Sequence, residues 1–157
     1  MQVTLDPQGV LYALVADGSV LRYQRGGELT ALSGPDVRTA GHYAHRTGFV
    51  WDLCEQALVV AGGDERNDAY LLGSSGELVP LPHGPRHGVG QTVATPHGVY
   101  RMVGAELWLL RDRQWSLVGK HDRGRRDYGA PLCLGKVVFS LHSQSVPSSS
   151  PDEPISA

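Results

Sequence analysis

Short apolar runs alternate with glycine- and aspartate-containing turns along most of the chain. Three segments share one pattern, in which a short run of β-forming residues, a tight turn and a second run with apolar residues follow one another. These segments are residues 19–32, 69–81 and 106–118. Apolar runs of this length between turn residues predict β-hairpins. No stretch longer than ten residues keeps an apolar period of 3.6, so the pattern predicts strands rather than helices.

Further apolar runs precede the second and third hairpins and give four short strands per repeat. They cover residues 42–50 and 57–63 in one repeat and 91–95 and 99–105 in the next, and a last run at 131–134 opens another repeat. With Leu29, Leu78 and Trp115 taken as equivalent, the repeats are 49 and 37 residues long. Four-stranded repeats at this spacing are typical of β-propeller blades. The predicted fold is all-β, with about three to three and a half antiparallel four-stranded blades.

The second repeat resembles a kelch repeat. Its apolar strand ends in Gly62-Gly63, an acidic turn follows, Tyr70 lies on the next strand, and Pro85-Arg86 precedes the next repeat. The third repeat keeps two tryptophans at aromatic positions but has Gly104-Ala105 instead of the diglycine, and the first repeat lacks the diglycine. The resemblance implies a kelch-type propeller of the galactose-oxidase-like kind, matched strongly in one repeat and loosely in the others.

The number of blades leaves the predicted ring incomplete. We expect blades over residues 1–37, 38–85 and 86–124, a partial blade over 125–142, and a disordered Ser/Pro-rich tail over 143–157. Closed propellers have about 4–8 blades, and an open array leaves apolar blade faces uncovered. We therefore expect the chain to complete a ring by homo-oligomerisation. A partial propeller that folds alone and another β architecture remain as alternatives.

Composition and charge narrow the classes of function. The 157 residues include 20 Gly and 10 Pro, which agrees with many tight turns, and the net charge of −2 provides no field for nucleic acid or an anionic membrane. Two cysteines are too few for a disulfide scaffold and fit a reducing compartment. No run resembles a signal peptide or a membrane span. We expect a cytoplasmic protein that does not bind nucleic acid.

Recurring arginines provide the candidate binding residues. An arginine follows each hairpin, in a predicted opening between blades, and two of these openings also hold a histidine. A guanidinium can tie neighbouring loops together through its five donors, or bind a carboxylate or phosphate, and both roles stay open. The predicted ligand-binding set is Arg38, His42, Arg86, His87 and Arg126.

The histidine spacings do not predict a metal site. His42 and His45 would point to opposite faces of a strand, and Pro85 between His83 and His87 excludes the regular helix that would align those two. No cysteine or acidic residue lies at convincing ligand spacing, and no Gly-x-Ser-x-Gly elbow occurs. We therefore expect no metal and no cofactor, and assign no catalytic residue.

The pattern favours a non-catalytic binding module whose inter-blade loops contact a protein or a small polar ligand. One alternative follows from the resemblance: some kelch-like propellers act on sugars, and a channel with arginine, histidine and Tyr128 could support acid–base chemistry. The other alternative is a structural remnant without a ligand. Titratable side chains that converge in one pocket would favour the enzyme.

Overall fold

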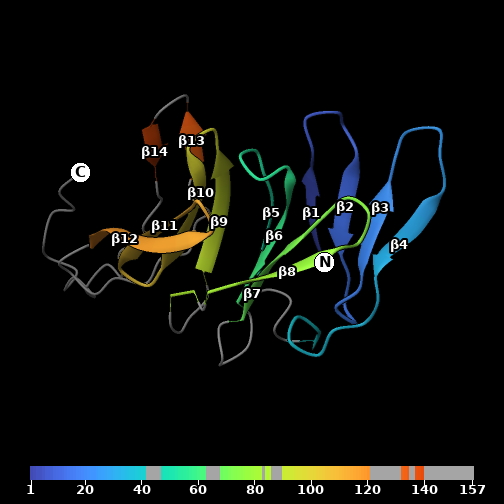
Figure 1. Ribbon diagram of the computed structural model, residues 1–157, viewed down its shortest axis with the longest axis horizontal. Helices are drawn as coiled ribbons and strands as arrows, with labels where there is room; N and C mark the ends of the chain where they lie inside the picture. Colours follow the sequence, from blue (N-terminus) through green and yellow to red (C-terminus); the bar gives the residue numbers. More distant parts are fainter. Residues whose placement is uncertain are drawn as a thin grey trace, which may run out of the picture.

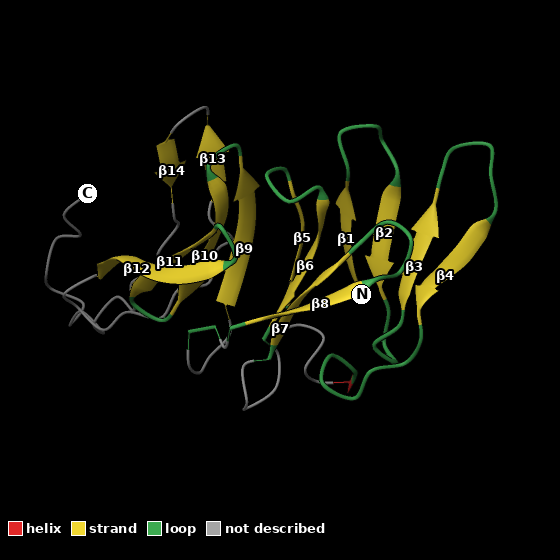
Figure 2. Ribbon diagram, in the orientation of Figure 1, coloured by secondary structure: helices red, strands yellow, loops and turns green. Residues whose placement is uncertain are grey.

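The structure is a computed structural model, and it describes residues 1–41, 47–62, 68–82, 84–85, 90–120, 132–134 and 137–139. These residues form three four-stranded antiparallel sheets and one two-stranded sheet, as Figures 1 and 2 show. The prediction of an all-β fold built from four-stranded meanders is confirmed.

Each large sheet contains four strands that follow one another along the chain, and we call these sheets blades 1, 2 and 3. Blade 1 contains β1 (Gln2–Leu5), β2 (Leu11–Leu14), β3 (Val20–Tyr23) and β4 (Leu29–Ser33). Blade 2 contains β5 (Gly48–Asp52), β6 (Ala57–Ala61), β7 (Ala69–Leu72) and β8 (Leu78–Leu81). Blade 3 contains β9 (Gly90–Thr95), β10 (Gly98–Val103), β11 (Glu106–Arg111) and β12 (Gln114–Lys120). The two-stranded sheet pairs β13 (Leu132–Leu134) with β14 (Val137–Phe139).

Two of the three predicted hairpin turns are closed by glycine, whereas Asp112 and Arg113 have the positive φ values in the β11–β12 turn. Gly26 in the β3–β4 turn and Gly76 in the β7–β8 turn have φ values of 77° and 89°, a region that side chains with a Cβ rarely adopt. In the β7–β8 turn the amide of Gly73 donates to the carbonyl of Glu77 at 2.8 Å, and the amide of Gly76 donates to that of Gly73 at 3.0 Å. The glycine-rich turns therefore fix the hairpins locally.

The blades are arranged around their first strands. β1 contacts β5, β5 contacts β9, and β9 contacts β13, while each following strand lies one step further from this inner row. Figure 1 shows blades 1, 2 and 3 side by side in this order. Sheets that share an inner row of first strands and pack face to face have the arrangement of a propeller.

Blade 2 lies between the other two blades and is buried on both faces. Every residue of β6 is buried, because its alternate side chains point to opposite faces of the sheet. Leu58 and Val60 pack toward blade 1, and Val59 packs toward blade 3. The apolar core is therefore divided between two interfaces instead of lying inside one sheet sandwich.

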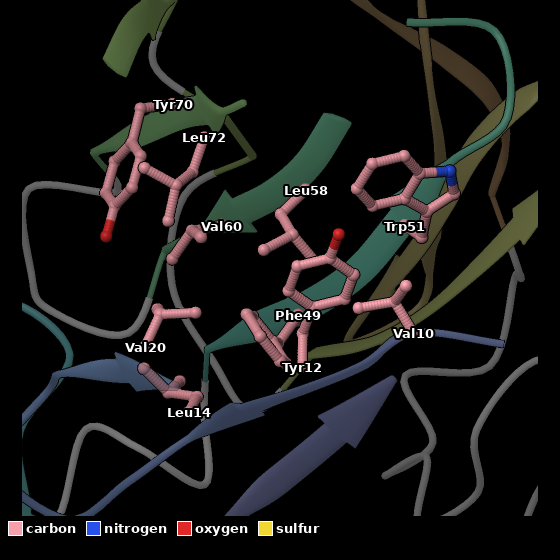
Figure 3. Close-up of a cluster of buried hydrophobic side chains, with 10 residues drawn as sticks. All are labelled: Val10, Tyr12, Leu14, Val20, Phe49, Trp51, Leu58, Val60, Tyr70 and Leu72. Carbon is pink, nitrogen blue, oxygen red and sulfur yellow. The ribbon is translucent and has the colours of Figure 1, made fainter. Parts of the chain in front are cut away.

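The interface between blades 1 and 2 holds the larger aromatic side chains. Figure 3 shows Trp51 and Tyr12 toward one end of this cluster and Tyr70 toward the other. The cluster consists of Val10, Tyr12, Leu14, Val20, Phe49, Trp51, Leu58, Val60, Tyr70 and Leu72. The interface between blades 2 and 3 holds smaller residues, namely Ala57, Val59, Ala61, Ala69, Leu71, Leu81, Val99 and Leu110.

Candidate functional site

Arg38 lies in the connection between β4 and β5, and other protein groups hold its guanidinium. Its Nε donates to Oδ1 of Asp36 at 2.9 Å, and its Nη2 donates to Oδ2 at 2.7 Å. The guanidinium carbon lies 5.1 Å from the centroid of the Tyr70 ring, and Nη1 lies 4.0 Å from Oδ2 of Asp68. Arg38 thus ties the loop between blades 1 and 2 to blade 2, which is the loop-tying role left open by the sequence.

The electrostatics of this cluster agree with a structural role. Burial on its own would raise the pKa of Asp36, but the hydrogen bonds from the side chain and backbone of Arg38 outweigh burial and lower it. Burial, followed by the nearby charge of Asp36, raises the pKa of Tyr70 to about 12. Asp36 therefore stays ionised and Tyr70 stays neutral at physiological pH.

The remaining predicted ligand-binding residues are His42, Arg86, His87 and Arg126. They lie outside the described residues, as do His45, His83 and Tyr128. Of the predicted set, the structure therefore describes Arg38, and the recurrence of arginine between blades stays a prediction.

A cleft of about 360 Å³ opens between blades 1 and 2, at the end of the blades opposite to Arg38. Hairpin turns supply most of its wall: the β1–β2, β3–β4, β5–β6 and β7–β8 turns each contribute at least one residue. Its lining consists of Asp6, Gln8, Val10, Tyr12, Arg22, Gln24, Trp51, Gln56 and Ser74. We call this the turn-end cleft.

Two buried donors in the lining of the turn-end cleft lack hydrogen-bond partners. The rings of Tyr12 and Trp51 stack with centroids 5.3 Å apart and planes 15° apart. Within the described part of the chain, Nε1 of Trp51 and Nε of Arg22 are buried and donate to no partner. Leaving a buried donor unsatisfied costs about 1–3 kcal/mol, so each such donor calls for an explanation.

Asp6 organises the β1–β2 turn in the lining of the turn-end cleft. Its Oδ1 accepts hydrogen bonds from the amides of Gln8 and Val10, both at 2.9 Å, and its Oδ2 accepts one from the Tyr12 hydroxyl at 3.3 Å. Burial and then the charge of Asp6 raise the pKa of Tyr12, while Arg22 opposes this rise. Tyr12 is therefore a neutral donor, and the Asp6 carboxylate is already engaged by the hairpin.

The sequence does not predict the turn-end cleft, because the residues that line it do not recur from blade to blade. A search for repeated positions finds Arg38 but passes over Tyr12 and Arg22, which are paired across β2 and β3 in blade 1. The sequence around Trp51 is that of an ordinary aromatic residue of the core, so it does not mark Trp51 as a cleft residue. The available signal was the local spacing of Asp6, Gln8 and Val10, which fits a carboxylate that caps a turn.

A second buried polar group, Arg101, lies between blades 2 and 3. It is 4% exposed, its Nη1 donates to Oγ1 of Thr92 at 3.1 Å, and burial lowers its pKa to about 10. A Cβ added at Gly62 would lie 3.1 Å from its Nη2, and Gly62 has a φ of 68°. The first glycine of the predicted diglycine therefore makes room for an arginine side chain of the next blade; Gly63 lies outside the described residues.

Among the described residues, no group of three or more His, Cys, Asp or Glu side chains is placed to hold a metal ion. The described residues also contain no helix that is long and apolar enough to cross a membrane.

Comparison with known proteins identifies the fold. No family model matches the chain, and no curated protein matches its sequence. Among solved structures, it is similar to a catalytically inactive virginiamycin B lyase from Staphylococcus aureus, a β-propeller enzyme solved with quinupristin. The TM-score is 0.67 at 12% identity, and the match covers 89% of this chain and 47% of that chain. The chain thus spans about half the length of the lyase chain, and its blades form part of a β-propeller.

Proposed function

We propose that the protein is a non-catalytic binding module and that the turn-end cleft takes a small polar ligand. The observation that carries this proposal is an open cleft lined by Trp51 and Arg22, whose buried donors Nε1 and Nε have no hydrogen-bond partner among the described residues. A ligand oxygen near each donor would supply the missing hydrogen bond and displace water from an aromatic wall. The proposed donors lie on β3 and β5 near the hairpin turns, away from the inter-blade loop where Asp36 holds Arg38.

The chemistry of the lining selects for a ligand rich in acceptor oxygens. Arg22 and Trp51 donate hydrogen bonds, while Gln24, Gln56 and Ser74 around them can both donate and accept. The Asp6 carboxylate already accepts three hydrogen bonds from the protein, so it leaves little capacity for a cation. Small carboxylates and sugars therefore fit better than ammonium compounds.

The proposal is tested by ligand-detected NMR with a set of small carboxylates and monosaccharides, followed by calorimetry of any probe that binds. Trp51→Phe keeps an aromatic ring against Tyr12 but removes the Nε1 donor, so we expect its affinity to fall about tenfold. Trp115→Phe is the matched control, because it removes another buried unpartnered Nε1 that lies outside the turn-end cleft. Absence of saturable binding, or equal weakening in both variants, would refute the proposal.

An enzyme is the second candidate, because the similar solved structure is that of a lyase. The described lining of the turn-end cleft includes no histidine, cysteine or lysine, and the pKa of Tyr12 is raised away from neutrality. These groups suit binding better than proton transfer at neutral pH. The kelch subtype of the blades likewise remains a prediction that rests on the second repeat.

A further inference from the structure

The face of blade 1 that points away from blade 2 is entirely apolar. Tyr12, Leu14 and Val20 point into the interface with blade 2, so the side chains that alternate with them point outward. The strand registers place these outward residues in two cross-strand rows, which we call the open face. The rows are Val3, Ala13, Leu21 and Ala31, and Leu5, Leu11, Tyr23 and Leu29.

Several of these side chains are widely exposed. Val3 is 55% exposed, Leu5 58%, Tyr23 40% and Leu29 62%. An antiparallel sheet with one solvated face usually has polar residues on that face. In blade 1 the exposed face carries apolar residues instead. A contiguous apolar surface of this kind marks an interaction site.

Blade 2 shows what such a face is built to contact. Its equivalent rows are Phe49, Val60, Tyr70 and Pro80, and Trp51, Leu58, Leu72 and Leu78. The six residues on β5, β6 and β7 are at most 5% exposed because blade 1 packs on them, whereas Leu78 on the outer strand stays 49% exposed. By the same register, the open face of blade 1 has the apolar rows of a face on which another blade packs.

We propose that a second copy of this chain covers the open face, so that two copies close one propeller ring. Among the described residues, the row of first strands runs from β1 through β5 and β9 to β13, so its two ends are blade 1 and the β13–β14 sheet. Each copy would place its open face on the last sheet of the other. The chain spans 47% of the lyase chain, so two copies supply about the length of one complete propeller.

Symmetry makes this arrangement a closed dimer. The two surfaces that meet are different, so the contact is head-to-tail; it closes into a ring only when each copy covers half a turn. A smaller rotation per chain would give larger rings or filaments. The molar mass of the species in solution therefore distinguishes a ring of two copies from an open face that is covered by something else.

The test is light scattering on a size-exclusion column from about 1 to about 100 μM chain, a range that spans micromolar dissociation constants. We expect a single species near twice the 16.9 kDa of one chain. A monomer throughout this range would overturn the proposal and assign the open face to another occupant. A mass that climbs with concentration beyond two chains would also overturn it.

Substitutions that introduce a charged residue into the open face test whether this face forms the dimer interface. Leu5→Glu and Val3→Glu, one in each row, should each raise the dissociation constant of the dimer at least about 100-fold, because they bury a charge in the apolar interface. Leu78→Glu is the matched control: it lies at the blade 2 position equivalent to Leu29, remains exposed inside a packed pair of blades, and should leave the dimer intact. Cooperative thermal unfolding confirms that each variant is folded. Dimers that persist in both folded open-face variants would contradict the proposal.

Discussion

At the scale of single residues, two glycines allow blades 2 and 3 to pack around a buried arginine. An added Cβ at Gly48 would overlap both the Arg101 guanidinium and the Thr92 hydroxyl, and Gly62 faces the same guanidinium. Arg101 lies on β10 of the next blade, so the requirement for glycine comes from a residue far away in the sequence. This is why the pattern around Gly62-Gly63 could indicate a close approach but not the partner.

We predict that Gly48→Ala lowers the free energy of unfolding by about 1–3 kcal/mol, because the neighbouring side chains must move to admit a methyl group. Urea unfolding followed by tryptophan fluorescence measures the change. Gly34→Ala is the control, since nothing lies within 4 Å of its added Cβ and its φ is not positive. It should change stability by less than about 0.5 kcal/mol, and equal losses in both variants would show that the Arg101 contact is misplaced.

Arg38 provides a prediction about pH. The folded protein lowers the pKa of Asp36 mainly through hydrogen bonds from Arg38, against the effect of burial. A carboxyl with a depressed folded pKa stabilises the protein at neutral pH, and this contribution is lost as the pH falls below about 4. Arg38→Gln should therefore lower the free energy of unfolding by about 1–2 kcal/mol at pH 7 and by less near pH 3.

Thermal unfolding between pH 7 and pH 3 measures that difference, and an NMR titration of the Asp36 carboxyl should show its pKa rising in the variant. Arg25→Gln provides the control because Arg25 is exposed in the β3–β4 turn. A pH-independent loss of stability in Arg38→Gln would mean that Arg38 acts by packing on Tyr70 and not through the charge of Asp36.

At the scale of elements, strands could be predicted wherever their signal is local. The continuous apolar run of β6, Ala57–Ala61, is typical of a strand buried on both faces, and the structure buries all five residues. The three predicted hairpins appear as β3–β4, β7–β8 and β11–β12. Of the run predicted from residue 42, the structure shows β5 from Gly48, and residues 42–46 lie outside the described residues.

One cross-strand row tests the burial of blade 2. Leu58 on β6 and Leu78 on β8 share the row that also contains Trp51 and Leu72, but Leu58 is fully buried and Leu78 is exposed. Leu58→Ala should cost about 2–5 kcal/mol because it leaves a cavity between blades, whereas Leu78→Ala should cost less than about 1 kcal/mol. Chemical denaturation of both variants checks this, and similar losses would contradict the assigned order of blades.

At the scale of the whole molecule, the sequence indicates the repeat but not how the repeats meet. Blade number and strand order follow from spacing and turn chemistry, which are local. The turn-end cleft depends on which turns two blades bring together, and Tyr12, Arg22 and Trp51 carry no shared motif. The open face could be anticipated in part, since an incomplete ring predicts uncovered blades; its composition becomes visible only when the register assigns alternate residues to one side.

Amide hydrogen exchange, resolved by strand, tests most directly the central claim that blade 2 is packed between two other blades. We predict the slowest exchange in β6, which is hydrogen-bonded on both sides and buried on both faces, and faster exchange in the outer edge strands β4 and β12. Exchange in β6 that is as fast as in β4 and β12 would contradict the arrangement of blades described above.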